Sequence, residues 1–132
     1  MAGVAGGLAE VAVSFKGAAV DVAMEPHMVL DANASYEETK FEKGPVWIRV
    51  DLTPEKAKAS RDVLHLRSES GFDEKKPVSA FKESGPKTVD VIFEDAPMDQ
   101  AFSLDVIDGA GRTHAIFAGI PYGDLRKSKN RF

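Results

Sequence analysis

The chain has 132 residues, of which 43% are hydrophobic and 29% charged, so it is long enough for one folded domain with a buried core. It contains no cysteine, which excludes disulfide bonds, thiolate metal sites and a thiol nucleophile. A net charge of −4 argues against a general nucleic-acid-binding protein, and no apolar run approaches the roughly 18 residues of a membrane helix.

The N-terminal stretch is not typical of a secretory signal peptide. It has no basic region ahead of its apolar residues, and it meets Glu10 early. Residues 1–7 are small and Gly-rich and are expected to be a loose end. We therefore expect a soluble protein without membrane insertion that is cytoplasmic as synthesised. Export by a dedicated secretion machine stays open.

Alternating apolar and polar residues predict β-strands along most of the chain, each with one buried and one wet face. The strands predicted before residue 87 are, in chain order, residues 8–15, 20–24, 27–31, 45–52, 62–68 and 78–81. Residues 36–43 fit either an edge strand or a helical turn, and the polar residues 70–77 predict a loop.

One short surface helix is predicted near residues 54–60. Thr53 can accept hydrogen bonds from the first free backbone N–H groups, and Pro54 suits the first helical position. Glu55 complements the positive end of the helix. The segment has no broad apolar face, so we expect a surface crossover of about two turns.

The strongest pattern lies between Lys87 and Leu125. Residues 89–93 and 102–106 alternate cleanly, and a turn-like link separates them, which predicts neighbouring antiparallel strands. Asp108 and Gly109 then predict a tight hairpin into a third strand, and the three together form a meander. The third strand, Ala115–Ile120, is apolar on both faces, so a loop, a second sheet or a partner is expected to cover both of its sides.

Roughly seven to nine strands, with turn signals about every ten residues, predict an all-β chain. We expect a single-domain antiparallel β-sandwich over residues 1–132, in preference to a barrel, with flexible ends at 1–7 and 126–132.

No catalytic motif, cofactor motif or metal site is evident in the sequence. The three histidines (His27, His65 and His114) are far apart, no serine lies in a nucleophile elbow, and no Gly-rich loop precedes a helix. The carboxylates between residues 87 and 108 are expected to face solvent; they are Asp90, Glu94, Asp95, Asp99, Asp105 and Asp108. A hydrolase with a site built from His65 or His114 and a distant carboxylate is an alternative that the sequence leaves open.

The end of the chain carries a short closing pattern. Its residues are Phe102, Ser103, Leu104, Asp105 and Val106, and after a Gly-rich turn Phe117, Ile120, Pro121, Tyr122 and Leu125. This pattern resembles a small β-sandwich module of bacterial contractile injection and type VI secretion systems and their peptidoglycan-targeting cargo. The resemblance covers the last third of the chain. It implies a β-sandwich and a role as a component or adaptor of such an apparatus.

The function expected from the sequence is a non-enzymatic protein–protein interaction or structural assembly module, acting on a protein partner or by self-association. The candidate contact residues are Trp47, Ile116, Ala118, Tyr122 and the basic tail residues Arg126, Lys127, Lys129 and Arg131. The tail is either a solvated end or docks on an acidic neighbour. The alternative is a module that binds a carbohydrate or another small ligand by stacking it on Trp47, Tyr36 or Tyr122.

Overall fold

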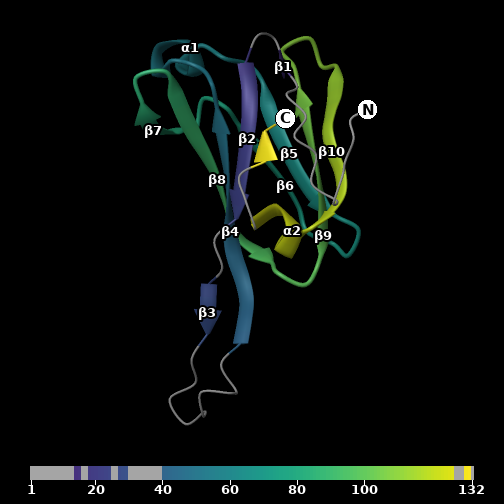
Figure 1. Ribbon diagram of the computed structural model, residues 1–132. Helices are drawn as coiled ribbons and strands as arrows, with labels where there is room; N and C mark the ends of the chain where they lie inside the picture. The colour runs from purple at the N-terminus through teal and green to yellow at the C-terminus, as the bar shows by residue number, and fades with distance from the viewer. Residues whose placement is uncertain (1–13, 16–17, 25–26, 30–39, 127–129, 132) are drawn as a thin grey trace.

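The computed structural model describes residues 14–15, 18–24, 27–29, 40–126 and 130–131, and the structural findings below concern these residues. Two antiparallel sheets pack face to face around one buried core (Figure 1). The predicted all-β sandwich is thus confirmed. Short strand pieces bring the described strands to eleven, and a second short helix joins the predicted one.

The larger sheet has the strand order β1-β2-β4-β8-β7, with β3 added to β4 and β11 added to β2. Its strands are β1 (Ser14–Phe15), β2 (Ala18–Met24), β3 (His27–Val29), β4 (Lys40–Val50), β7 (Lys82–Gly85), β8 (Thr88–Pro97) and β11 (Asn130–Arg131). Of the residues 8–15 predicted as the first strand, 8–13 lie outside the described residues.

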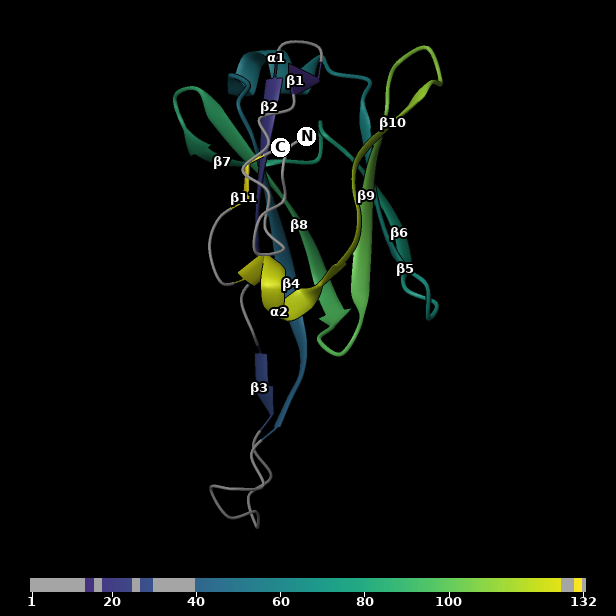
Figure 2. The same cartoon turned by 45° about the vertical axis from the view of Figure 1, so that its right-hand side comes forward.

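The smaller sheet has the order β10-β9-β5-β6. Its strands are β5 (Val63–Ser68), β6 (Asp73–Pro77), β9 (Ala101–Ile107) and β10 (Thr113–Pro121). β8 and β9 follow each other along the chain but belong to opposite sheets, so the predicted three-stranded meander is wrong. The link after Pro97 crosses from one sheet to the other, so of the three predicted strands β9 and β10 pair as a hairpin and β8 does not join them (Figure 2).

The core lies between the sheets and is built from the alternating positions of both. β4 and β8 supply Val46, Ile48, Val50, Val89, Val91 and Phe93, and β5 and β9 supply Leu64, Leu66, Phe102, Leu104 and Val106. Period-two alternation therefore identified the buried faces of β4, β8 and β9 correctly.

Two short helices close the sandwich. α1 (Pro54–Lys58) begins as predicted, with the Thr53 hydroxyl accepting a hydrogen bond from the Lys56 backbone N–H at 3.2 Å. α2 (Tyr122–Arg126) lies against β2 of one sheet and β10 of the other and buries Tyr122 and Leu125. Among the described residues, no helix is long and apolar enough to cross a membrane.

Two local predictions between residues 70 and 86 are wrong. Residues 73–77 form strand β6 on β5 where a loop was predicted. Residues 78–81 form a turn where a strand was predicted, and β7 begins only at Lys82. β6 is an edge strand with mostly exposed residues, so it lacks the alternation by which strands are recognised.

Lys76 links the two sheets beside the short strand β7. Although it lies on β6, its amine donates a hydrogen bond to the Ile92 carbonyl of β8 at 2.8 Å. The amine also lies 5.9 Å from the centroid of the Phe93 ring. An inward-pointing lysine on an open stretch of sheet edge opposes the addition of a foreign strand there.

Candidate functional site

Three of the six carboxylates that were expected to face solvent are buried instead. Asp90 is 4% exposed, Asp105 is 7% exposed and Asp108 is 8% exposed. That part of the prediction is wrong because each of the three has a cationic or histidine partner at a neighbouring position, and alternation along a single strand cannot reveal this.

Asp90 forms a two-pronged ion pair with Arg49 on the outer face of the larger sheet. The Arg49 Nε lies 2.9 Å from Asp90 Oδ1, and the Nη2 lies 3.3 Å from Oδ2. Strand register places Asp21 and Lys82 in the same row, so opposite charges alternate across β2, β4, β8 and β7. The hydrogen bond to Asp90 raises the pKa of the Arg49 guanidinium above its ordinary value. A permanently charged arginine makes this pair a structural clamp rather than an acid–base site.

A second set of pairs lies on the outer face of the smaller sheet. Arg67 Nη2 lies 2.9 Å from Asp105 Oδ2, and His65 Nε2 lies 2.8 Å from Asp73 Oδ1. The histidine–aspartate pair lies at the edge strand β6, where the Asp73 side chain is 62% exposed. In the described part of the chain, no group of three or more His, Asp or Glu residues is placed to hold a metal ion.

Asp108 organises the loop between β9 and β10. Its Oδ1 accepts hydrogen bonds from the backbone N–H groups of Ala110 and Arg112, both at 2.9 Å, and its Oδ2 lies 3.0 Å from His114 Nε2. The predicted hairpin is present, but the positive φ that it requires, +86°, falls on Gly111. The Asp108–His114 pair therefore stabilises the turn between β9 and β10.

Asp108→Ala is expected to lower the free energy of unfolding by about 2 kcal/mol, because it removes the acceptor of two loop N–H groups and of the His114 ring. Urea denaturation followed by circular dichroism measures this loss. Amide exchange should also become faster at Ala110 and Arg112. Asp99→Ala, at an exposed turn position, is the matched control and should leave both measurements unchanged. Equal stability of the two variants would contradict the role of Asp108.

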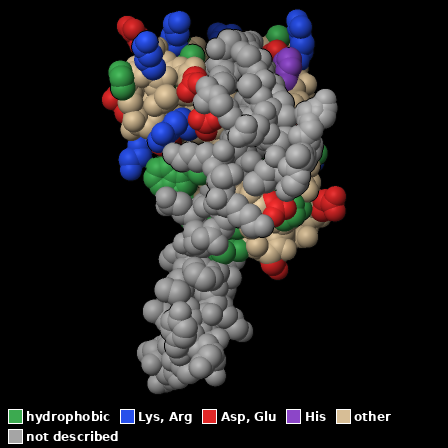
Figure 3. Space-filling view, viewed as in Figure 1, with side chains coloured by type: hydrophobic (Ala, Val, Ile, Leu, Met, Phe, Trp, Pro, Cys, Tyr) green, Lys and Arg blue, Asp and Glu red, His purple; other side chains and the backbone are tan. Residues whose placement is uncertain are grey.

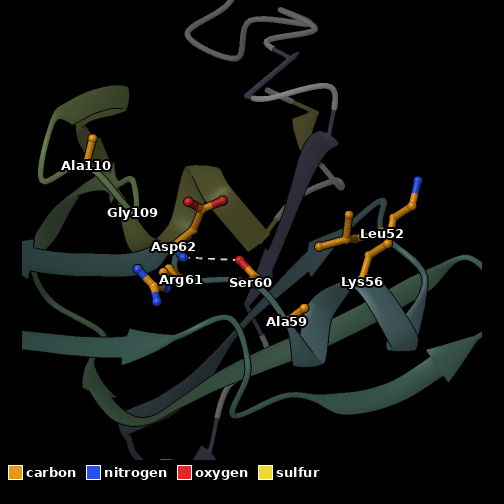
Figure 4. Close-up of a pocket in the computed structure, with 8 residues that line it drawn as sticks. All are labelled: Leu52, Lys56, Ala59, Ser60, Arg61, Asp62, Gly109 and Ala110. Carbon is orange, nitrogen blue, oxygen red and sulfur yellow. Dashed lines mark hydrogen bonds between the residues drawn. The ribbon is translucent and has the colours of Figure 1, made fainter.

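A shallow pocket of about 530 Å³ lies between the α1–β5 connection and the β9–β10 loop (Figure 4). The Ser60 hydroxyl inside it accepts a hydrogen bond from the Asp62 backbone N–H at 3.1 Å. The cationic side chains of Lys56 and Arg61 point in opposite directions (Figure 4), so they do not converge on a shared ligand position. The described lining therefore lacks the convergent polar groups of a specific ligand site.

Trp47 lies on the outer face of the larger sheet, between Ala23 and Ile92 of the neighbouring strands. Its side chain is half-buried, and its indole N–H is buried with no hydrogen-bond acceptor among the described residues. A ligand cannot accept that hydrogen bond unless the surrounding atoms move. Tyr122, another expected stacking residue, is 1% exposed, and Tyr36 lies outside the described residues.

The predicted contact residues on β10 have different environments. Ile116 and Phe117 are consecutive, yet both are buried. Register shifts on either side of Phe117 turn both side chains toward the core. Ala118 is exposed, so the expected cover on both faces of β10 is not supplied by this chain itself.

The basic tail is only partly described. Arg126 ends α2, whereas Lys127 and Lys129 lie outside the described residues. Arg131 belongs to β11 and is paired in register with Asp21 of β2. The tail thus adds a strand to the larger sheet, beside an acidic residue.

β3 and one end of β4 form a two-stranded projection, which we call the arm. It comprises His27–Val29 of β3 and Lys40–Lys43 of β4. β8 accompanies β4 only as far as the Lys43–Pro97 pair. Beyond it, Lys40 and Phe41 pair with β3 alone among the described strands, and the register shifts at Glu42. Figures 1 and 2 both show β3 and this end of β4 beyond the body of the sandwich. At about 3.4 Å per residue, the eleven residues of β4 span about 35 Å.

The sequence patterns pointed to the two segments of the arm but did not predict that they pair with each other. They predicted a short strand at residues 27–31 and left 36–43 open between a strand and a helical turn. The charged segment 36–43 shows no clean alternation, so the pairing of its last residues with residues 27–29 could not be predicted.

The described charges elsewhere on the body are mixed in sign. On the face drawn in Figure 3, Lys and Arg side chains lie among Asp and Glu side chains over the upper part of the molecule. On this face, the described charges do not form the single-sign patch that is typical of nucleic-acid binding.

Comparison with known proteins gives no significant match: no family model, curated protein or solved structure is similar to this chain.

Proposed function

We propose that this chain is a non-enzymatic protein–protein interaction or assembly module that binds through its arm. The observation that carries the proposal is the two-stranded extension of β3 and β4 beyond the sandwich. An isolated two-stranded ribbon is marginally stable in water, so such an arm gains stability when another strand or surface covers it. Main-chain groups along a strand edge bind an added strand with little dependence on its sequence.

The polar groups of the body support a binding role over a catalytic one. Asp90, Asp105 and Asp108 are each engaged by a partner that stabilises a strand or a turn. Their pairing explains their burial without a reaction, since buried charges are retained when they are paired and hydrogen-bonded.

The proposed setting is a bacterial contractile injection or secretion apparatus. Its support is the resemblance of the closing pattern from Phe102 to Leu125. Genes for a sheath or baseplate beside the gene for this chain would favour that setting, and a metabolic operon would count against it while leaving the binding role standing.

Site-specific crosslinking tests the binding role. Because the chain has no cysteine, Lys40→Cys carries a single photocrosslinker on the arm, and Lys87→Cys carries it on the exposed turn between β7 and β8. Irradiation in extract from the source cells should yield one defined protein adduct with the arm label and none with the turn label. The captured protein, once purified, should bind the unlabelled chain.

A shortened chain provides the control. Met24 and Val46 are paired in register, so replacing residues 25–45 with Asn-Gly joins β2 and β4 through a two-residue hairpin. This variant should retain a cooperative thermal transition and lose binding. If it binds the purified partner as tightly as the full chain does, the proposed function is wrong.

A further inference from the structure

We propose that a β-bulge at Asp95, at the base of the arm, sets and holds the direction in which the arm leaves the sandwich, so that the arm meets its partner already oriented. The use of the arm for binding rests on the proposed function, whereas its direction does not. A binding segment that is already oriented loses less conformational freedom when it binds, so more of its contact energy appears as affinity.

The pairing of β4 with β8 reveals the bulge. Phe93 of β8 pairs with Val46 of β4. The next pair toward the arm joins Ala96 to Gly44, and the register shifts between the two pairs. The chain thus advances three positions along β8 but only two along β4, so β8 carries one extra residue. Such a residue bends the strand that contains it and increases the local twist.

The other edge of β4 keeps its register at the same level. Met24 of β2 pairs with Val46 of β4. His27 of β3 pairs with Lys43 of β4, so both strands advance three positions between the two pairs. A second shift lies further out, at Glu42 within the arm. At the base of the arm the extra length therefore lies on the β8 side alone, and a one-sided insertion turns the strands that continue past it.

Asp95 has the backbone conformation of a bulge residue. Its φ of +58° is the one positive φ of a non-glycine residue in the described part of the chain. Aspartate is among the few residues that adopt this left-handed region. Glu94 and Asp95 are both exposed, and the fully buried Ala96 follows them. The extra residue thus returns Ala96 to the core face, from which regular alternation after Phe93 would turn it away.

Pro45 favours the bulge from the opposite strand. It lies between the two pairs that enclose the shift, in a strand with β8 on one edge and β2 and β3 on the other. Proline cannot donate a hydrogen bond to a neighbouring strand, and within sheets it is confined to edge strands, strand starts and bulges. The irregular pairing at Asp95 therefore accommodates Pro45 inside the sheet.

The base of the arm is anchored to the core, which favours one direction over a range of directions. Beyond the bulge, Gly44 pairs with Ala96 and Lys43 pairs with Pro97. Gly44 is buried and Ala96 is 0% exposed. β4 itself is continuous and leads from the body of the sandwich into the arm (Figures 1 and 2).

Pulsed electron spin resonance on doubly labelled chains measures the direction of the arm. Because the chain has no cysteine, spin labels can be placed at Lys40→Cys on the arm and at Lys87→Cys or Glu74→Cys on the body. The two body positions lie on different sheets, so the two distances respond to different movements of the arm. Each pair should give one narrow distance distribution. Broad distributions would show that the arm has no fixed direction and would overturn the inference.

Removing the bulge should change these distances. Deletion of Asp95 combined with Pro45→Val makes the pairing regular and still leaves Phe93 and Ala96 on the core face. At least one distance should then shift by more than the width of the parent distribution, while thermal unfolding stays cooperative. Two unchanged distances would mean that the bulge does not direct the arm.

Substitution at Asp95 tests the same point without changing the length of the chain. Asp95→Gly should keep both distances, because glycine readily adopts a positive φ. Asp95→Val should shift or broaden them and lower the thermal midpoint by roughly 3 to 8 °C relative to Asp95→Gly, since a β-branched residue is strained at this φ. Glu94→Val, at the adjacent exposed position without a positive φ, is the matched control and should behave as the parent chain. If valine at position 95 is tolerated as well as glycine, the inference is wrong.

Affinity measurements separate this inference from the function it rests on. The deletion variant keeps every residue of the arm, so it should bind the purified partner about tenfold more weakly or worse through the changed direction alone. Shifted distances with full affinity would overturn the orienting role of the bulge and leave the binding role intact. If crosslinking captures no partner, the proposed function falls, and the distances alone decide whether the bulge directs the arm.

Discussion

Phe102→Ala is expected to lower the free energy of unfolding by about 4 kcal/mol. Phe102 is fully buried on β9, and its ring meets the edges of two other rings, with centroids 5.7 Å away at Phe72 and 6.4 Å away at Tyr122. It thereby joins the smaller sheet, the loop before β6 and helix α2. Removing the ring leaves a cavity among elements that cannot all close on it. Urea denaturation followed by circular dichroism measures the loss.

Phe81→Ala is the matched control for that variant. Phe81 is only partly buried and lies in the turn before β7, so the same substitution should cost about 1 kcal/mol. Helix α2 should also lose amide-exchange protection in the Phe102 variant and keep it in the Phe81 variant. Equal losses of stability would show that the ring contacts of Phe102 do not hold helix α2 and the smaller sheet together.

Arg49→Met is expected to cost about 2 to 3 kcal/mol, because it leaves the Asp90 carboxylate buried without its partner. The Asp90 side chain is only 5% exposed, whereas that of Arg49 is 38% exposed. The cost should therefore fall below the roughly 3 to 5 kcal/mol that is typical when one partner of a fully buried pair is removed. Thermal and urea denaturation at neutral pH both measure it.

The double variant Arg49→Met with Asp90→Val distinguishes the cost of leaving a buried carboxylate unpaired from the cost of losing the ion pair itself. Replacing both partners with apolar residues removes the buried carboxylate, so stability should return to within about 1 kcal/mol of the parent chain. If the double variant is as unstable as Arg49→Met, the loss comes from the packing of the Arg49 stem. The unpaired Asp90 carboxylate is then not the cause of that loss of stability.

The positions of the strands were largely predictable, whereas their neighbours were not. Val89, Val91 and Phe93 alternate because one face of β8 is buried, and alternation reports that face. It carries no information on which strand lies alongside. β8 therefore pairs with β4 and β7, although β9 follows it directly in the chain.

The environment of charged residues was the least predictable feature of the body. Asp90 and Asp105 occupy the outward positions that a pattern assigns to solvent, yet both are buried beneath arginines from adjacent strands. Arg49 is 41 residues from Asp90 in the chain, and Arg67 is 38 residues from Asp105. Pairing at such separations depends on register, which only the assembled sheets define.

The closing segment of the chain was partly predictable. β10 ends at Pro121, within the closing pattern, whereas Tyr122, which was expected as a contact residue, enters the core together with Leu125. The helix that carries them was missed, because five residues are too few to show a helical period. The bulges of β10 were also missed, and they explain why Ile116 and Phe117 can both be buried.

The fold class, the helix start at Thr53 and the faces of the main strands could be predicted, because these depend on periodicity and on residues close together in the chain. The division of β8 and β9 between two sheets, the burial of three aspartates and the arm that β3 and β4 form became visible only in the folded chain. Each of these depends on which distant segments pair and in what register. Pairing is chosen by the free energy of the whole sandwich, to which every strand contributes.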